Sequence, residues 1–170
     1  MENSVRLSKF LSKILRHKAE EYGFAIQSDG FVSVSELLAH RDFRRFTLED
    51  IVHVVETNDK KRFELCTGAY KFCFRLKLTF LILLTYVVHG EMKIRAVQGH
   101  SLRNIDDTLL LTLITNPADL PVALHGTNIN ALSSIMATGL DRMSRNHIHL
   151  AVGTPEEGVI SGMRKNVKVI

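Results

Sequence analysis

Apolar residues recur along the first helical stretch of the chain with the spacing of a single helix face. They occupy positions i, i+3, i+4, i+7 and i+8, and residues at this spacing share one side of an α-helix. These residues are Leu7, Phe10, Leu11, Ile14 and Leu15. Three cations follow, at the helix end where the macrodipole favours positive charge. The pattern predicts an amphipathic helix that packs on a core and ends in a basic turn.

Short helices and a hairpin are predicted after this helix. Ser28-Asp29-Gly30 is a strong turn signal between two apolar stretches, 23–27 and 30–34, which predicts a β-hairpin. Two capping boxes each open a short helix. They pair Ser33 with Glu36 and Thr47 with Asp50. Residues 62–65 alternate like a strand, so residues 1–65 are expected to form a winged-helix-like lobe.

The pattern changes at Cys66. Residues 66–90 are aromatic and β-branched with few turn signals, and we interpret them as an atypical apolar insert. Beyond the insert the periodicity predicts a strand over 92–96, a connector over 103–120 and a strand over 121–124. A helix follows, with Ile129, Leu132, Ile135 and Met136 on one face and Gly139 as its stop. A strand over 147–150 and a helix that starts at Thr154 complete the prediction. This mixture of helices and strands indicates an α/β protein of the α+β type.

Composition is typical of a globular chain. Of the 170 residues, 45% are apolar and 24% are charged, which is enough to build one domain or two small lobes. The net charge of +4 permits a nucleic-acid or phosphate partner.

Cysteine usage and apolar runs bear on the compartment. Cys66 and Cys73 match no zinc or redox spacing, which indicates free thiols in a reducing compartment. The apolar run 78–88 is about half of the ~20 residues that a bilayer needs, so no membrane role is expected. No signal peptide precedes the first helix, and we expect a cytoplasmic or nuclear protein.

The basic end of the first helix has two interpretations. Arg16, His17 and Lys18 can simply complement the helix dipole on a solvated turn. Alternatively, Arg16 and His17 can form an anion site in which a guanidinium fork lies beside an imidazole. The run 60–62 carries three cations with the same ambiguity, because a lone charge run is usually a solvated face.

Arginines and histidines also gather in the second half. They stand at strand ends or glycine turns, where scaffolds present functional groups: Arg95, His100, His125, Arg145, His147 and His149. His147 and His149 form an H-x-H pair, but no nearby cysteine or carboxylate completes a zinc set, so no metal is expected. The glycine after His125 either allows close approach to a ligand or serves a turn that needs φ > 0. Arginine and histidine side chains suit the stabilisation of phosphate charge.

Seven short motifs follow one another along the chain. They are Leu7–Leu11 with Leu15–His17, Asp29–Val32, Asn58–Phe63, Ile94–Ser101, His125–Thr127, Arg145–Leu150 and Ile160–Arg164. Each is weak alone, but in this order they resemble the tRNA 2′-phosphotransferase family (Tpt1/KptA). The resemblance covers nearly everything except residues 66–90.

The resemblance implies an N-terminal winged-helix-like RNA lobe and a C-terminal lobe of the ADP-ribosyltransferase type that binds NAD. The family removes the splice-junction 2′-phosphate of ligated tRNA. In its reaction the phosphate attacks C1″ of the nicotinamide ribose, nicotinamide leaves, and the 2″-hydroxyl then attacks the phosphate. The products are repaired RNA and ADP-ribose 1″,2″-cyclic phosphate. A monomer with 2′-phosphorylated tRNA and NAD as substrates is therefore expected.

Site residues carry over from the family motifs onto matching positions. The catalytic set implied by the resemblance is Arg16, His17, Arg62 and Arg145. The residues implied for NAD are His125, Gly126, Thr127, His147 and His149. The residues implied for the RNA substrate are Lys61, Arg95, Gln98, His100 and Ser101.

The chain departs from the family pattern at three places. Val97 stands where the motif usually has asparagine, residues 66–90 replace a short strand-turn, and the family lobe normally continues beyond Ile170. Residues 91–170 are therefore expected to form a partial ADP-ribosyltransferase-like lobe. Two alternatives stay open: a catalytically inactive RNA-binding fragment, and an ADP-ribosyltransferase that acts on another acceptor.

Overall fold

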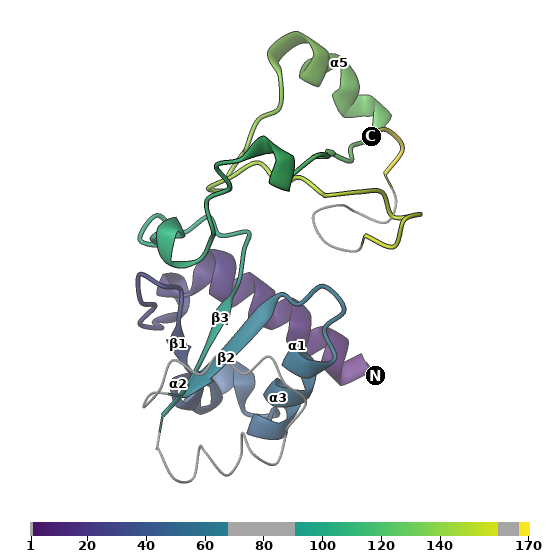
Figure 1. Cartoon of the computed structure of the whole chain (residues 1–170). Coiled ribbons are helices and arrows are strands. Elements are labelled where there is room, and N and C mark those ends of the chain that lie inside the picture. The colour runs from purple at the N-terminus through teal and green to yellow at the C-terminus, as the bar shows by residue number, and fades with distance from the viewer. Residues whose placement is uncertain (1, 68–90, 160–166) are drawn as a thin grey trace. The chain divides into compact units, whose positions relative to one another are not determined.

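The computed structural model describes residues 2–67, 91–159 and 167–170, and the chain divides into two compact units (Figure 1). Unit 1 spans residues 1–111 and unit 2 spans residues 112–170. The described elements combine short helices with a small antiparallel sheet. The α+β class that the pattern predicts is therefore confirmed.

The first helix of unit 1 has the inner face that its sequence predicts. α1 (Glu2–Lys13) continues without a break into a π-helical turn, η1 (Ile14–Lys18). Four of the five predicted core residues expose 1% of their surface or less: Leu7, Leu11, Ile14 and Leu15. The fifth, Phe10, is half-buried against Phe43, with 4.7 Å between the ring centroids.

Both capping boxes open helices where predicted. Ser33 is the N-cap of α2 (Val34–Ala39) and accepts a hydrogen bond from the Glu36 backbone N–H. Thr47 is the N-cap of α3 (Leu48–Glu56), and Asp50 returns a bond to the Thr47 N–H at 2.9 Å. The short 3₁₀ turns of the described chain are η2 (Glu20–Tyr22), η3 (Arg41–Phe43), η4 (Asp107–Leu109) and η5 (Pro117–Asp119).

Three antiparallel strands form the described sheet of unit 1 in the order β1-β3-β2. They are β1 (Val32–Ser33), β2 (Phe63–Thr67) and β3 (Met92–Ala96). The strands predicted at 62–65 and 92–96 are thus confirmed. Ile94 pairs with Val32 on one side and with Leu65 on the other.

The hairpin predicted around Ser28-Asp29-Gly30 is wrong in one half. The turn itself forms, because the Gly30 N–H donates to the Gln27 carbonyl at 2.9 Å. Residues 24–27 nevertheless form no strand, and β1 pairs with β3 instead. This pairing places Val32 beside Ile94 in the core, which a local hairpin does not achieve.

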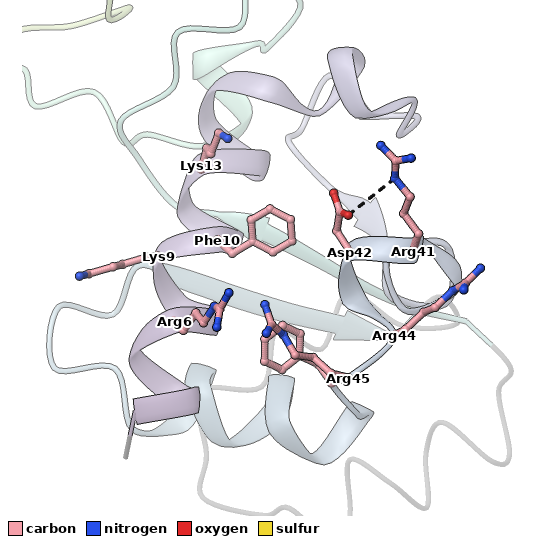
Figure 2. A pocket seen from close by; sticks show the side chains of 9 residues that line it. Arg6, Lys9, Phe10, Lys13, Arg41, Asp42, Arg44 and Arg45 are labelled. Carbon is pink, nitrogen blue, oxygen red and sulfur yellow. Dashed lines mark ion pairs between the residues drawn. The ribbon is translucent and has the colours of Figure 1, made fainter.

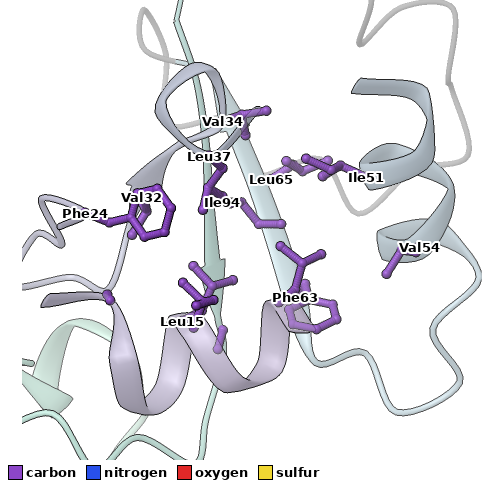
Figure 3. Packing of buried hydrophobic residues seen from close by; sticks show 14 of the residues in the cluster. Leu15, Phe24, Val32, Val34, Leu37, Ile51, Val54, Phe63, Leu65 and Ile94 are labelled. Carbon is purple, nitrogen blue, oxygen red and sulfur yellow. The ribbon is translucent and has the colours of Figure 1, made fainter. Parts of the chain in front are cut away.

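One hydrophobic cluster holds unit 1 together. It joins α1, η1, α2, α3 and all three described strands (Figure 3). Figure 3 shows Leu15, Ile94 and Phe63 in this shared interior, drawn from a helix and two strands. Full burial of each such side chain contributes roughly 1.5–3 kcal/mol. The residues that carry candidate chemistry in unit 1 therefore extend from a packed scaffold.

Unit 2 contains less regular structure than its sequence predicts. α5 (Ile129–Thr138) forms and ends at Gly139, whose φ of 82° confirms the predicted stop. The strands predicted at 121–124 and 147–150 are wrong, because this region contributes only an isolated bridge between Leu124 and Ala151. Isolated strand segments gain few ladder bonds without neighbours on both sides, and the alternating pattern alone does not supply those neighbours.

One further prediction in unit 2 differs from the structure, and the exposure of α5 adds a second observation. Thr154 and Glu157 exchange the bonds of a capping box, at 2.6 and 3.3 Å, but residues 155–158 form a turn and not a helix. The apolar face predicted for α5 is exposed at Ile129 (65%) and Met136 (79%) and half-buried at Leu132 and Ile135. Helical spacing therefore identified the helix but not a buried face.

The division between the units differs from the lobe boundary expected at residues 66–90. β3 is the central strand of the sheet, and Leu102 and Ile105 join the same core, so residues 91–111 belong with unit 1. Most of the apolar insert lies outside the described residues, as does the motif segment 160–164. Among the helices of the described ranges, none has the length and apolar character needed to cross a membrane.

Candidate functional site

The segment after β3 connects two parts of the predicted catalytic set. At its start, the Val97 N–H donates to the Arg62 carbonyl at 2.9 Å. At its end, the Ser101 N–H donates to the Arg16 carbonyl at 2.9 Å. Residues 97–101 therefore link the backbone of Arg62, which precedes β2, to the basic turn that ends the first helix.

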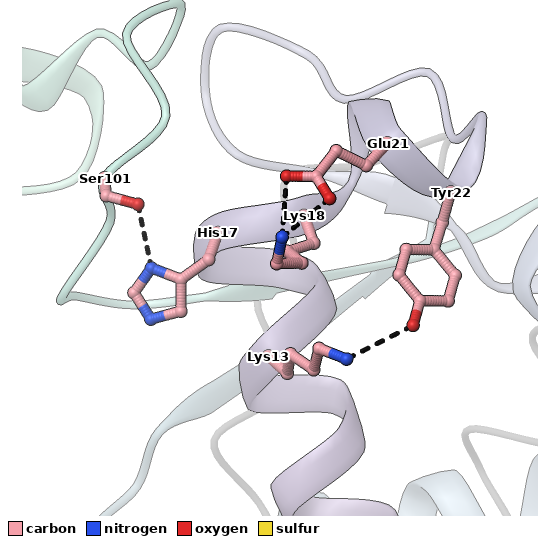
Figure 4. Close-up of polar contacts among 6 residues, drawn as sticks. All are labelled: Lys13, His17, Lys18, Glu21, Tyr22 and Ser101. Carbon is pink, nitrogen blue, oxygen red and sulfur yellow. Dashed lines mark hydrogen bonds and ion pairs between the residues drawn. The ribbon is translucent and has the colours of Figure 1, made fainter.

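The basic turn is held by a side-chain contact as well. A hydrogen bond of 2.9 Å joins the Nδ1 of His17 to the Ser101 hydroxyl (Figure 4). His17 is exposed and Arg16 is half-buried, both within the π-helical turn η1. π-Helical turns are rare and occur frequently at functional sites. The bond to Ser101 thus orients the His17 ring through Nδ1.

Lys18 behaves differently from Arg16 and His17. Its ammonium group forms an ion pair with Glu21 at 2.6 Å, on the same turn of the chain (Figure 4). The dipole-complementing, solvated interpretation of the basic turn therefore fits Lys18. It does not fit His17, because a contact 84 positions along the chain orients that side chain.

Asn58 organises Arg62. Its side-chain oxygen accepts hydrogen bonds from the Arg62 backbone N–H and from the Nη1 of the same residue, both at 3.2 Å. Its amide nitrogen donates to the Ser8 hydroxyl of α1 at 3.2 Å. Lys61, which lies between Asn58 and Arg62 in the chain, adopts the left-handed conformation with φ of 44°. Few residues other than glycine adopt this conformation. Sequence reasoning quoted Asn58 as part of a motif but assigned it no role.

Arg95 is engaged on several sides. Its Nε donates to a carboxylate oxygen of Glu64 at 2.7 Å, and its Nη1 donates to the Asp29 carbonyl at 3.0 Å. The guanidinium also lies over the Phe31 ring, 4.6 Å from the centroid. These contacts cross-link β3, β2 and the turn before β1. Arg95, which is predicted to bind substrate, therefore also stabilises the scaffold.

His100 is the buried histidine of this cluster, with 3% of its surface exposed. Burial, together with the nearby charges of Arg16, His17 and Arg95 and against the opposing effect of Asp107, lowers the pKa of His100 to about 4. Its imidazole is therefore neutral at pH 7. Its Nε2 has no hydrogen-bond partner among the described residues. The same positive field that disfavours protonation of His100 also attracts an anion.

Two further members of the predicted RNA set lie in the same region of unit 1. Gln98 is half-buried in the segment 97–101, and Lys61 is exposed beside Arg62. Unit 1 thus brings together Arg16, His17, His100 and Ser101 around one end of this segment, and Lys61 and Arg62 around the other.

Unit 2 brings two of its histidines together. The Nδ1 of His125 lies 3.1 Å from the His149 carbonyl, and a carbonyl only accepts, so Nδ1 carries the proton. In the neutral form of the ring, this leaves Nε2 of His125 as an acceptor. His149 in turn uses its Nδ1 on the His147 carbonyl at 3.2 Å. This chain of contacts fixes the ring orientations of two predicted cofactor residues.

The neighbouring turn is held through its backbone. The Thr127 N–H donates to the Val169 carbonyl at 2.9 Å, and the Thr127 carbonyl accepts from Lys168 at 3.0 Å. Gly126 is half-buried between these anchored positions. Arg145 is exposed, and its carbonyl accepts a bond of 2.7 Å from the Arg142 guanidinium. Within the described part of the chain, no three histidine, cysteine or carboxylate side chains converge as a metal site.

Comparison with known proteins identifies this arrangement. The family model described as "RNA 2'-phosphotransferase, Tpt1 / KptA family" matches residues 2–170. The chain belongs to the Tpt1/KptA family. The geometry described above is therefore that of a Tpt1/KptA chain.

Similar relatives of this Tpt1/KptA chain come from animals and fungi. The "tRNA 2'-phosphotransferase 1" of Danio rerio is 44% identical over 164 residues, covering 95% of this chain and 64% of the relative. The mouse protein of the same name is 42% identical over 170 residues, covering 99% and 60%. The "tRNA 2'-phosphotransferase" of Saccharomyces cerevisiae is 37% identical over 175 residues, covering 99% and 67%. The chain thus spans less than two thirds of the length of the two animal relatives.

Proposed function

We propose that the chain acts as an NAD-dependent RNA 2′-phosphotransferase that removes the splice-junction 2′-phosphate of ligated tRNA. The observation that carries the proposal is the segment 97–101, which holds Arg16 and His17 at one end and Arg62 at the other. Membership of the Tpt1/KptA family supports the same activity, and the relatives bear names that describe it.

In this proposal unit 1 binds the RNA 2′-phosphate. The guanidinium groups of Arg16 and Arg62 donate to phosphate oxygens, because planar forks match that geometry. His17 presents its Nε2 edge while Ser101 holds the other side of the ring. As charge moves onto the phosphate oxygens during transfer, donors already in place stabilise it without rearrangement.

The remaining unit 1 residues shape the RNA side of the site. Lys61 adds an exposed cation beside Arg62, and Gln98 and Arg95 lie on the segment and strand that bound the cluster. His100 stays neutral, so its unpartnered Nε2 accepts or donates without adding charge. A neutral imidazole suits contact with a ribose hydroxyl or base edge.

Unit 2 holds NAD in this proposal. The fit rests first on His125, whose Nε2 in the neutral ring can accept a hydrogen bond from a ribose hydroxyl. It rests also on the half-buried Gly126 and Thr127, because Gly126 has no Cβ and lets a ligand approach the backbone. His147 and His149 extend this surface, and Arg145, which the family motifs imply as catalytic, is an exposed cation of the same unit. When bound, NAD would supply the ribose C1″ that takes the RNA 2′-phosphate as nicotinamide leaves, and the 2″-hydroxyl that then displaces the RNA from the phosphate to give repaired RNA and ADP-ribose 1″,2″-cyclic phosphate.

The lobe assignments belong to the same proposal. Unit 1 would correspond to a winged-helix-like RNA lobe, and its helices packed on a small antiparallel sheet support this. Unit 2 would correspond to part of an ADP-ribosyltransferase-like lobe. A monomer that acts on 2′-phosphorylated tRNA is the working form in this proposal.

One observation favours a second candidate function, a non-catalytic RNA-binding fragment. In the described ranges the buried hydrophobic residues belong to unit 1 except for Ala151. Unit 1 therefore has the packed scaffold that RNA binding requires. An ADP-ribosyltransferase that uses another acceptor is distinguished by its product alone.

The decisive experiment supplies the chain with NAD and a short oligonucleotide that carries one internal 2′-phosphate. The expected products are dephosphorylated RNA, nicotinamide and the cyclic phosphate, identified by mass spectrometry. Arg16→Ala should lower the rate by about 10²–10³, the cost of one lost transition-state donor. Arg103→Ala, an exposed arginine of unit 1, is the matched control.

Each candidate has its own outcome in that experiment. Binding of the oligonucleotide without nicotinamide release, in a chain whose unit 1 is folded, supports the RNA-binding fragment. Labelled ADP-ribose left on an RNA 5′-phosphate or on a protein supports the alternative acceptor. Equal rates for wild type and Arg16→Ala contradict the proposed role of the basic turn.

A further inference from the structure

A second basic site lies on unit 1, and none of the residues assigned above to the phosphate site lines it. It is a cavity of about 610 Å³ between α1 and the segment that contains η3 (Figure 2). Six cations line it: Arg6, Lys9, Lys13, Arg41, Arg44 and Arg45. The first three follow helical spacing on α1, and the other three lie within five consecutive positions. Phe10 and Phe46 complete the apolar part of the wall.

The positive charge of the chain is concentrated in this basic cavity. Asp42 is the one carboxylate in its wall. The chain has 22 basic and 18 acidic residues, so removing the six cations and Asp42 leaves 16 basic and 17 acidic residues. The rest of the chain is therefore nearly neutral. A net positive charge that is concentrated at one site indicates an anionic partner at that site. It is not a general property of the surface.

Neutralisation by neighbours is limited in the basic cavity. Elsewhere in unit 1, Lys18, Lys93 and Arg95 each pair with a glutamate. In the cavity Asp42 pairs with Arg41, at 3.7 Å. Among the side chains that the structure describes, no carboxylate forms an ion pair with Arg6, Lys9, Arg44 or Arg45. Like charges on facing walls repel one another, and an anion between them removes that repulsion.

The aromatic residues show what kind of contact the cavity can make. Phe46 is buried, and the guanidinium of Arg45 covers its ring at 5.0 Å from the centroid. Phe10 packs on Phe43. Phe46 is thus closed to base stacking, and the half-buried Phe10 offers only part of its ring, whereas sequence-tolerant single-strand binding relies on open aromatic platforms. Recognition must therefore come from charge.

The distribution of the cations separates a polyanion from a single small anion. A site for one phosphate brings several buried donors to one point. Here Arg6, Lys9, Arg44 and Arg45 are exposed and spread over two elements. Figure 2 shows Lys9 and Arg44 pointing outward on opposite sides of the group. Such a row suits successive phosphates along one strand, each releasing counterions as it binds.

We propose that the basic cavity binds the phosphodiester backbone of RNA, at a second contact region separate from the phosphate site. The contact is independent of base sequence and positions the RNA strand on unit 1. The inference rests on the proposed function for one point, the identification of the polyanion as RNA. It does not require the chain to be catalytically active.

The test measures binding of a fluorescent 20-nucleotide RNA without any 2′-phosphate, over a series of salt concentrations. Arg6→Gln/Arg45→Gln removes two charges, Arg6→Lys/Arg45→Lys keeps them, and Arg103→Gln/Lys168→Gln removes two charges from exposed positions outside the cavity. Loss of two phosphate contacts should lower the slope of log K against log[salt] by about 1.4 and the affinity at 0.15 M salt about tenfold. The lysine pair and the outside pair should stay near wild type.

Several results would overturn the inference. Equal losses in the Arg6/Arg45 and Arg103/Lys168 glutamine pairs would show that only net charge matters. Inorganic phosphate that competes with RNA at equimolar amounts would indicate a single-anion site. Selective loss of binding to anionic vesicles, with RNA binding unchanged, would assign the cavity to a membrane surface. Unchanged thermal unfolding of all three variants excludes misfolding as the cause.

The same variants separate this inference from the proposed function. Turnover is measured with a trinucleotide that carries the 2′-phosphate, because it offers few further phosphates to the cavity. A wild-type chain without turnover contradicts the phosphotransferase proposal but leaves the binding test of the cavity intact. If Arg6→Gln/Arg45→Gln has normal turnover and unchanged RNA binding, only the proposal that the basic cavity binds RNA is contradicted.

Discussion

The two units position their candidate residues by different means. Unit 1 buries side chains from helices and strands in a single cluster, and its site residues contact one another through side chains. In the described part of unit 2, Ala151 is the buried hydrophobic residue, whereas Met136 and Met143 expose 79% and 78% of their surfaces. Its site residues are tied mainly by bonds to the backbone. Rigidity of a site thus follows from the packing beneath it.

The largest expected effect tests this difference in packing directly. Leu11→Ala removes a side chain with 0% exposure from the core of unit 1 and should cost about 2–5 kcal/mol of unfolding free energy. Met136→Ala on α5 should change it by less than about 0.5 kcal/mol, because that side chain already contacts water. Urea unfolding followed by circular dichroism measures both. Similar losses would contradict the contrast between the units.

Acid should destabilise unit 1 through His100. Its folded pKa of about 4 lies below the ordinary 6.5, so between these values the unfolded state binds a proton that the folded state does not. Stability is therefore complete above about pH 6.5 and falls as the pH drops toward 4, by roughly 3 kcal/mol in total. Unfolding free energies of wild type and His100→Gln at pH 7 and pH 4.5 measure the difference. His53→Gln, on the exposed side of α3, is the control.

Asn58 should matter as a positioning residue for Arg62. Asn58→Ala removes the acceptor of two Arg62 hydrogen bonds, and a lost buried bond costs about 1–3 kcal/mol. Binding of a 2′-phosphorylated oligonucleotide should weaken about tenfold. Asn58→Asp keeps the acceptor and should restore most of the affinity, whereas a merely structural role would leave both variants alike. Asn104→Ala, an exposed change, should have no effect.

The smallest expected effect compares the helix caps of the two units. Thr47 caps α3 through a complete capping box, and Thr47→Ala should cost about 1 kcal/mol. Asn128 stands at the N-cap of α5 without a side-chain capping bond, so Asn128→Ala should cost only a few tenths. Thermal unfolding measures each change. A larger loss at Asn128 would show that α5 depends on its cap more than its geometry indicates.

Much of unit 1 was predictable because its signals are local. The inner face of the first helix and the caps Ser33 and Thr47 depend on residues three or four positions apart. The strands at 62–65 and 92–96 followed from their alternation. Unit 2 was harder, because strands without paired neighbours reduce to isolated bridges, as at Leu124 and Ala151.

The candidate site shows the same division. Family motifs named Arg16, His17 and Arg62, whose residue types suit phosphate. The supporting contacts came from the structure, namely Ser101 on His17 and Asn58 on Arg62. The basic cavity also escaped the sequence, since Arg6 and Arg45 are 39 positions apart and no local pattern joins them.

From the sequence alone came α1, α2 and α3, the caps Ser33 and Thr47, the family, and the residues suited to binding phosphate. Each depends on residue identity at short spacing or on motifs in order. The tertiary structure alone decided that β1 pairs with β3, that residues 91–111 belong to unit 1, and that His100 is buried among cations. These features depend on contacts between segments tens of residues apart, whose free energy is set by packing and not by the local pattern.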